Sequence, residues 1–311
     1  MTRAIGHSPS NPSPAALLGP NSPSLAQERW CEIDRCAIWA LEMELQLYPK
    51  AGLVSFVDNG SHDDMDANTF MRSIAALKGY FRIMAQAGAA GAQFFELKAV
   101  GMDVEAQMFH ATDGINTHRG AVFSLGLLAA AAGRRHGANV DGDALTNARG
   151  ICRAVADWGS GINAARPTVD ISHGAKVRAR YGVTGAREQA ASGFPILHEH
   201  ILPMFAAAYQ ESGCLTKAGL QAFYATITVL EDNNLLYRAG TEGLAYAQNS
   251  ARAFLAGGGM MAADGHQRAR DMHAEFVARR LSPGGAADMI AAVFFLAAVT
   301  GLIPRQVLPW R

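Results

Sequence analysis

The chain has 311 residues, of which half are apolar and 17% are charged. This composition is typical of a globular protein and excludes a wholly disordered chain. Lys plus Arg and Asp plus Glu number 27 each, so the chain has no overall positive field to hold nucleic acid. The four cysteines show no CxxC spacing, which argues against structural zinc and disulfides and fits a cytoplasmic location.

The first 24 residues contain five of the twelve prolines and predict a disordered leader, residues 1–24, ahead of a folded domain, residues 25–311. The apolar run Ala15–Leu18 is too short for a secretory signal. At the other end, Met289–Leu302 is the one candidate for a membrane span. A run of 14 residues is short for a bilayer, so we interpret it as a buried core helix.

Helical periodicity dominates the folded part. Apolar residues recur at steps of three and four from Trp30 to Tyr48, where Pro49 ends the helix, and again from Phe70 to Met84, with Asp66 as a candidate N-cap. Only Gly52–Val57 looks extended. Further helical patterns lie near 94–110, 119–136, 143–158, 186–210, 216–231, 234–256 and 265–280, and a last helix begins at Ser282-Pro283. The predicted fold is an all-α, single-domain multi-helix bundle with a disordered N-terminal leader.

Polar residues gather between these helices. Lys50 lies on a turn between Pro49 and Gly52, where its ammonium suits a phosphate or simply faces solvent. Asp63, Asp64 and Asp66 follow within sixteen residues. Carboxylates this close repel one another and suit Mg²⁺, although acidic residues also stabilise the start of a helix.

The segment from Glu105 to Gly120 carries the densest polar loop, with Asn116, Thr117, His118 and Arg119 in succession. One interpretation is a capped helix start, with Thr117 as the N-cap and Asn116 stabilising the turn. The other is a site in which His118, titrating near neutrality, transfers protons. On this interpretation Glu105 is a ligand, a base or an orienting group for the loop.

Two later segments have a similar character. Thr184 is a candidate cap for a helix whose first turn includes Gly185 and Arg187, a setting that suits an anion or a solvated arginine. The GxxxxGK[ST] spacing of a Walker A loop is absent. The run Glu231–Asn234 with Arg238 is paired with the segment Ser282–Asp288 as a further polar site. The run is either a second carboxylate face for a metal–phosphate or a helix end followed by a cap.

These segments, in this order, resemble the triphosphoribosyl-dephospho-CoA synthase family, whose members prepare the prosthetic-group precursor of citrate lyase and of malonate decarboxylase. The resemblance spans roughly Ile33 to Leu302. It is carried by six segments: PKAGLV at 49–54, NGSHDDMD at 59–66, ATDGINTHRGAVFSLGLL at 111–128, YGVTGAREQAASGFP at 181–195, DNNLLYRAG at 232–240 and LSPGGAADM at 281–289.

The chain departs from the family pattern at four positions. Ala51 stands where Pro is expected, Arg119 where Lys is expected, Asn233 where Thr is expected and Ala286 where Ser is expected. Arg119 keeps the charge but replaces a point ammonium by a planar fork. Ala286 lacks a hydroxyl, which puts a ligand role for that position in doubt.

The resemblance implies that ATP and 3′-dephospho-CoA give 2′-(5″-triphosphoribosyl)-3′-dephospho-CoA and adenine, with the product passed to a transferase that loads an acyl carrier subunit. Adenine, and not ADP, is then the product released from ATP. It also implies a site made from the polar segments. The residue types within those segments supply the candidates for each role. The candidate catalytic residues are Glu105, His118 and Asn116; the candidate substrate-binding residues are Lys50, Thr117, Arg119, Arg187, Asn234 and Arg238; and the candidate Mg²⁺ ligands are Asp63, Asp64, Asp66 and Asp232.

For these residues to form one site, the segments at 49–66, 112–119, 184–188 and 231–238 must converge on one cleft. Two other classes of function remain open. A Mg²⁺-dependent enzyme similar to a prenyl-diphosphate synthase would need a DDxxD signature, and Ala67 stands where its last carboxylate belongs. The second alternative is a non-catalytic protein that binds a nucleotide or CoA. An adenine-release assay distinguishes such a protein from the enzyme.

Overall fold

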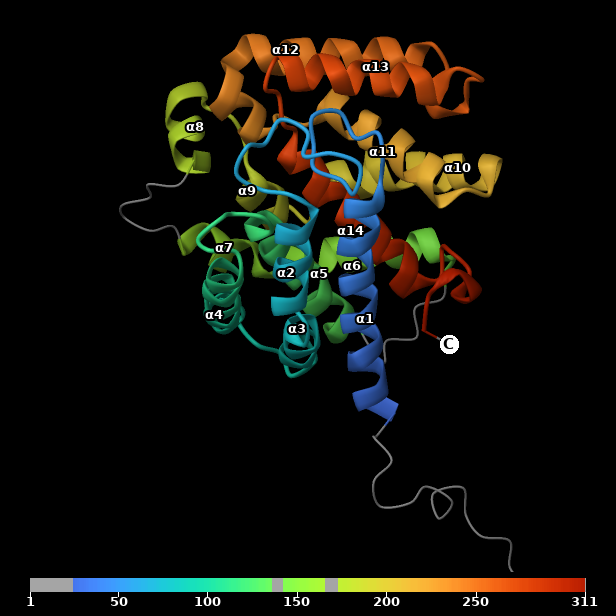
Figure 1. Ribbon diagram of the computed structural model, residues 1–311. Coiled ribbons are helices and arrows are strands. Elements are labelled where there is room, and N and C mark those ends of the chain that lie inside the picture. The colour runs from blue at the N-terminus through green and yellow to red at the C-terminus, as the bar shows by residue number, and fades with distance from the viewer. Residues whose placement is uncertain (1–24, 136–141, 166–172, 311) are drawn as a thin grey trace, which may run out of the picture.

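The computed structural model describes residues 25–135, 142–165 and 173–310, and these residues form helices and no β-strand (Figure 1). The all-α prediction is confirmed, while the predicted leader, residues 1–24, lies outside the described residues. The α-helices are α1 (Leu25–Gln46), α2 (Ala67–Ala76), α3 (Tyr80–Ala89), α4 (Phe94–Ala111), α5 (Arg119–Arg134), α6 (Ala144–Val155), α7 (Gly159–Ala164), α8 (His173–Tyr181), α9 (Ala186–Ala191), α10 (Leu202–Ser212), α11 (Leu215–Val229), α12 (Asn233–Ala256), α13 (Gly265–Ala278) and α14 (Gly284–Thr300).

Helix α14 forms the centre of the bundle and packs against α1, α5, α6 and α11. Every residue from Met289 to Ala298 is buried. A helix that is apolar on all its faces is stable only where other elements surround it. The interpretation of this segment as a core helix is therefore confirmed, and no helix in the described ranges is long and apolar enough to cross a membrane.

Helices α3 and α5 approach each other unusually closely. A Cβ atom on Gly88 would lie 1.9 Å from the carbonyl oxygen of Ala130, and one on Gly133 would lie 2.0 Å from that of Ala85. Neither position has room for a methyl group, so glycine lets the two backbones touch. This contact fixes the place of α5, whose N-terminal end enters the site described below.

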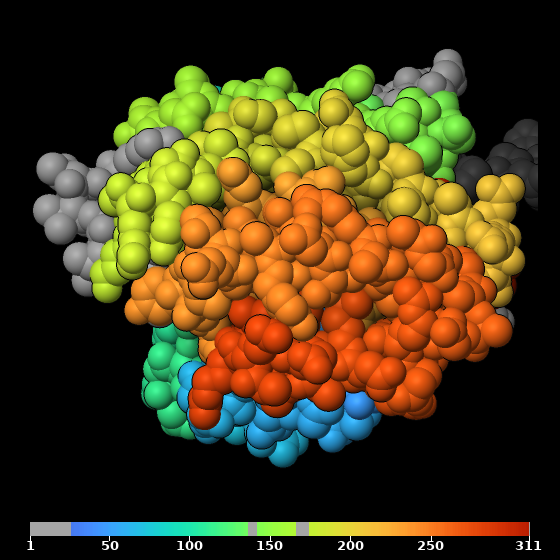
Figure 2. Space-filling model, turned by 90° about the horizontal axis from the view of Figure 1, so that it is seen from above, coloured from blue at the N-terminus to red at the C-terminus, as the bar shows by residue number. Residues whose placement is uncertain are grey.

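Helices α12 and α13 form an outer layer at the top of the molecule and lie side by side across the face seen from above (Figures 1 and 2). The backbone of α12 leaves helical geometry at Gly240, where φ is 64°. The first turn of this helix carries Asn233 and Asn234, which line the cleft described below.

Several predicted elements differ from those observed. The helix expected to run through Phe70–Met84 is two helices, α2 and α3, because Gly79 has a φ of 88° between them. The pattern at 186–210 contains α9, a π-helical turn (Leu197–Ile201) and α10, because the chain turns at Gly193 and Phe194, both with positive φ. The segment Gly52–Val57, expected to be extended, contains a turn at Gly52, an irregular stretch and a bend at Phe56 and Val57. Helix α14 begins one residue later than expected, with Pro283 as its N-cap.

Candidate active site

A cleft with a volume of about 1090 Å³ lies between the helices. Its wall includes residues of α1, α4, α5, α9, α12 and α14 and of the segments that precede α2, α5, α9 and α12. This volume exceeds the range of roughly 300–1,000 Å³ that is usual for a single small-molecule site. All four segments expected to converge contribute to this wall, so that prediction is confirmed.

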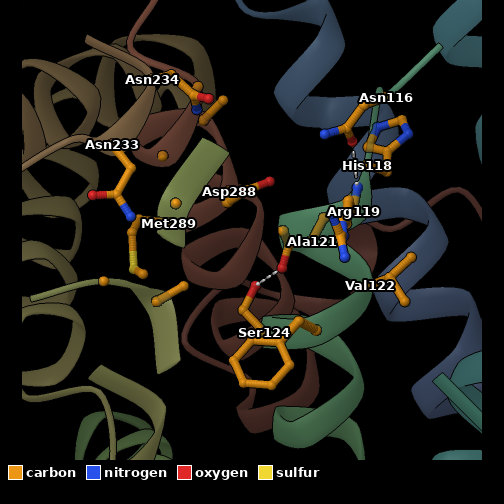
Figure 3. A pocket seen from close by; sticks show the side chains of 18 of the residues that line it. Asn116, His118, Arg119, Ala121, Val122, Ser124, Asn233, Asn234, Asp288 and Met289 are labelled. Carbon is orange, nitrogen blue, oxygen red and sulfur yellow. Dashed lines mark hydrogen bonds between the residues drawn. The ribbon is translucent and has the colours of Figure 1, made fainter. Parts of the chain in front are cut away.

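Two walls of the cleft face each other in close view (Figure 3). Asn233 and Asn234, at the start of α12, lie on one side. Asn116, His118 and Arg119 lie on the other, at the start of α5. Asp288 of α14 projects between them. Residues more than 100 positions apart in the sequence therefore meet in one place.

The loop before α5 is held by its own polar side chains. Asn116 Oδ1 accepts a hydrogen bond from the backbone N–H of Arg119 at 3.3 Å, and Arg119 Nε donates to Glu105 Oε1 at 2.8 Å. Thr117 Oγ1 donates to Ser73 Oγ of α2 at 2.8 Å. The expected Thr117 N-cap is therefore wrong, because its hydroxyl bonds across to α2, and His118 occupies the N-cap position.

His118 is buried at the bottom of this loop. Its Nδ1 lies 2.6 Å from Ser73 Oγ, its ring packs edge-on against Phe70, and its Nε2 has no protein partner. Burial, together with the nearby charge of Lys50, lowers the pKa of His118 to about 3. The expectation that His118 titrates near neutrality is wrong, because an imidazolium here would lose its hydration. His118 therefore presents a neutral ring.

Lys50 lies directly behind the cleft wall and is only 1% exposed. Its Nζ donates to the side chain of Glu44 at 2.5 Å and to the Glu44 carbonyl oxygen at 2.6 Å. Burial lowers the pKa of Lys50, while Glu44 opposes that effect. Glu44 itself lines the cleft. The positive charge of Lys50 therefore offsets the negative charge that Glu44 places beside the cleft. Lys50 is thus not a solvated lysine.

The carboxylates of the acidic segment have separate partners. Asp66 is the N-cap of α2, as predicted, and accepts from the N–H of Thr69 at 2.8 Å. Asp63 is exposed and pairs with Arg280 at 2.6 Å. Asp64 lines the cleft, 3.5 Å from His62 Nδ1. In the described part of the chain, no three His, Cys, Asp or Glu side chains come together as a ready-made metal site.

Asp232, the N-cap of α12, is buried beside the first turn of α14. Its Oδ1 accepts from the N–H groups of Asn234 at 2.8 Å and Leu235 at 3.3 Å, and its Oδ2 accepts from Ala286 at 3.0 Å. Burial raises the pKa of Asp232 to about 6, although these hydrogen bonds oppose the shift. Both oxygens therefore join the start of α12 to α14, and the cap interpretation of this segment is correct.

Two predicted arginines line the cleft while bonded to backbone. Arg187 donates to the carbonyl oxygen of Ile162 at 2.7 Å. Arg238 donates to that of Ser61 at 3.2 Å and lies 3.2 Å from His62 Nδ1. The expected Thr184 cap is wrong, because its N–H and hydroxyl both donate to Glu231 at 3.2 Å.

Buried polar atoms without a partner concentrate at this site. Among the described residues there are four such side-chain atoms, and three of them belong to cleft residues: His118 Nε2, Gln189 Oε1 and Asn233 Oδ1. Native proteins leave few buried polar groups unpaired, because each costs about 1–3 kcal/mol. The cleft therefore offers hydrogen-bonding groups that a polar ligand would satisfy.

Three residues of the cleft region received no role from the sequence. Glu44 lies within a helical pattern and carries no signal of its own until Lys50 is seen against it. Ser73 is an ordinary helix residue that proves to hold His118 and Thr117. Asp288 had a signal, since it is the only charged residue in the otherwise apolar segment of α14.

Known proteins resemble this chain over most of its length. The model of the family described as ATP:dephospho-CoA triphosphoribosyl transferase matches residues 31–306. The chain belongs to this family. A protein of Stutzerimonas stutzeri (strain A1501) named "Probable 2-(5''-triphosphoribosyl)-3'-dephosphocoenzyme-A synthase" is 40% identical over 291 residues, which cover 92% of this chain and 96% of the relative.

Relatives with the same name in Acinetobacter calcoaceticus and Photobacterium profundum are 36% and 34% identical. These matches cover 85% and 86% of this chain and 89% and 87% of the respective relatives. No solved structure matches the chain. Within this triphosphoribosyl transferase, all six segments that carry the family resemblance contribute residues to the cleft wall.

Proposed function

We propose that this chain transfers the triphosphoribosyl group of ATP to the 2′-hydroxyl of 3′-dephospho-CoA and releases adenine. The observation that carries the proposal is the meeting of all six family segments in one cleft. The family match across residues 31–306 and the names of the relatives support the same reaction. The volume of about 1090 Å³ also suits two nucleotide substrates better than one.

The reaction exchanges two bonds at one carbon. The bond from ribose C1′ of ATP to adenine N9 breaks, and a bond from C1′ to the 2′-oxygen of dephospho-CoA forms. As in other glycosyl transfers, the ribose carbon should develop oxocarbenium character. The protein must hold the triphosphate in place, position the hydroxyl and move one proton from that hydroxyl to adenine.

Positive charge on both sides of the cleft supports a triphosphate site. Arg119 lies on one wall, while Arg187 and Arg238 line other parts of the cleft. Each guanidinium is already held in position, that of Arg119 by Glu105 and those of Arg187 and Arg238 by backbone oxygens, and so loses little freedom when a phosphate binds. In our proposal these three arginines bind phosphates, and Lys50 adds its charge from behind the wall.

The segment Asn116–Gly120, called the NTHRG loop below, would bind the reacting sugars. Asn116 and Thr117 line the cleft and hold the loop in shape through their own hydrogen bonds. The unpartnered Nε2 of His118 suits a sugar hydroxyl, and a neutral imidazole bonds to it without adding charge. Glu105 holds Arg119 and thereby aims it. Asn234 faces them from the other wall.

We further propose that Mg²⁺ enters with ATP. Mg²⁺ is commonly held by one or two carboxylates together with substrate phosphates and water, so a ready-made protein cage is unnecessary. Asp64 is the carboxylate of the acidic segment that lines the cleft, and it fits this arrangement. Asp63, Asp66 and Asp232 are engaged elsewhere. When bound, Mg²⁺ would neutralise charge on the triphosphate.

The remaining expectations concern the cellular setting. We propose a cytoplasmic enzyme, in agreement with four free cysteines. Its product would pass to a transferase that loads an acyl carrier subunit, in citrate lyase or in malonate decarboxylase.

Chromatography of a reaction with ATP, Mg²⁺ and 3′-dephospho-CoA tests the proposed activity. We expect adenine to appear in amounts equal to the new triphosphoribosyl product, and only when dephospho-CoA is present. ADP as the main product, or adenine release independent of dephospho-CoA, would reject it. Neither product would appear if the chain were a binding protein.

A further inference from the structure

Asp288 occupies the centre of the cleft although none of the roles above requires it. It lies in the first turns of α14, a helix with no other charged residue. Its side chain is partly exposed and projects into the cleft between the two walls (Figure 3). Burying an ionisable group in an apolar helix is costly, so such a group is usually retained for a function.

The neighbouring helix leaves a space that matches this carboxyl group. A Cβ atom on Gly120 would lie 1.9 Å from Asp288 Oδ2, so any side chain at this position would displace the carboxyl group. The next residue, Ala121, directs its backbone N–H towards Asp288. The start of α5 therefore holds Asp288 at a fixed position beside the NTHRG loop.

The charged neighbours of Asp288 favour its protonated form. Glu44 of α1 and Asp232 at the start of α12 are both acidic, and α5 contributes only a backbone N–H. Two cations of the cleft region are already paired with other carboxylates, Lys50 with Glu44 and Arg119 with Glu105. Burial first, and then these two carboxyl groups, raise the pKa of Asp288 well above its ordinary value. The side chain thus keeps its proton to a higher pH than an exposed aspartic acid.

We propose that Asp288 is the catalytic residue that carries the proton during triphosphoribosyl transfer, an inference that rests on the proposed function. Its carboxyl group gives a proton to a ring nitrogen of adenine while the bond from C1′ to N9 breaks. The resulting carboxylate faces the oxocarbenium-like ribose. It then takes the proton of the 2′-hydroxyl as the bond from C1′ to that oxygen forms, which restores the starting carboxyl group without any further reactant.

The other candidates suit this role less well. His118 has a pKa of about 3 and so carries no proton to give near neutral pH. Glu105 is already engaged in an ion pair with Arg119 at 2.8 Å. Asp232 has both oxygens occupied by backbone N–H groups. Asp288 alone combines a central position, a retained proton and an oxygen open to the cleft.

Replacing Asp288 by Asn tests the proposal, because the amide keeps the shape of a protonated carboxyl group but cannot transfer its protons. We expect kcat to fall about 10²–10⁴-fold, the usual contribution of a general acid–base. Binding of ATP and of dephospho-CoA should stay within about threefold. Asp264→Asn, the same change at an exposed residue outside the cleft, should retain wild-type kcat. A D288N protein with near-normal kcat, or one that folds but binds no ATP, overturns the proposal.

A second substrate separates proton transfer from a purely structural effect. ATP methylated at N7 carries a cationic base that leaves without taking up a proton. The D288N defect should therefore shrink at least about tenfold with this analogue, since only the hydroxyl proton then remains to be moved. An equal defect with both substrates overturns the proposal.

Gly120→Ala provides an independent variant, because it displaces the carboxyl group without removing it. It should lose kcat as D288N does. The fall of wild-type kcat/KM as the pH rises through the pKa of Asp288 should be absent from D288N. A G120A protein with normal kcat, or an unchanged pH profile in D288N, contradicts the proposed role. A wild-type protein that releases no adenine would instead reject the proposed function itself.

Discussion

Replacing Lys50 by Met should destabilise the protein by about 3–5 kcal/mol, because the change leaves Glu44 as an unpaired charge in a buried position. Lys50 is 1% exposed and makes two hydrogen bonds to Glu44, at 2.5 and 2.6 Å. A loss of this size is a large fraction of the roughly 5–15 kcal/mol that holds a typical domain together. Urea denaturation, with the slope m compared between variants, measures it.

Two further variants show whether the unpaired charge is the cause. Replacing Lys50 and Glu44 together by Met should recover most of the loss, because it removes both charges from the buried position. Arg305→Met breaks an ion pair with Glu32 whose arginine is 74% exposed, and it should cost about 0–1 kcal/mol. The reasoning is refuted if Lys50→Met costs less than about 1 kcal/mol, or if the double variant is no more stable than the single one.

Three other changes address the metal, the buried histidine and the helix contact. Asp64→Asn should raise the Mg²⁺ concentration for half-maximal adenine release about tenfold and leave the melting temperature unchanged. If the variant keeps full turnover and the wild-type Mg²⁺ dependence, Asp64 does not bind the metal. Because the pKa of His118 is lowered to about 3, its contribution to stability is complete above about pH 6.5 and is lost as the pH falls towards 3. Between about pH 7 and pH 4.5 the wild type should therefore lose about 3 kcal/mol more unfolding free energy than His118→Gln, and equal losses would contradict the assigned pKa. Gly88→Ala places a methyl group 1.9 Å from the Ala130 carbonyl oxygen and should cost about 1–3 kcal/mol in urea denaturation; a neutral effect would show that α3 and α5 separate freely.

Sequence periodicity predicted the elements that are long and regular. Helix α14 could be assigned to the core because its apolar residues leave no polar face. The break at Gly79 could not be found in the same way, because a glycine within a helical pattern is compatible with a continuous helix until its φ of 88° is known. Local sequence thus predicts helices better than it predicts their interruptions.

The site was predictable at the level of segments and not of contacts. The family motifs identified the loops that meet in the cleft. The partners of individual side chains depend on distances across the fold, as in Ser73 beside His118 or Asp232 bonded to Ala286. For the same reason, the low pKa of His118 was not foreseeable, since burial is a property of the folded chain.

The packing of α14 against α1 has a consequence for the order in which the protein can mature. About 240 residues separate the end of α1 from the start of α14, so at roughly 5–20 residues per second the first helix waits about 12–50 s on the ribosome for its partner. During that interval the apolar faces of α1, α5 and α11 have no central helix to cover them. The nascent chain also lacks the cleft residues that α14 supplies. Nucleotide binding therefore cannot guide the steps of folding that precede the synthesis of α14.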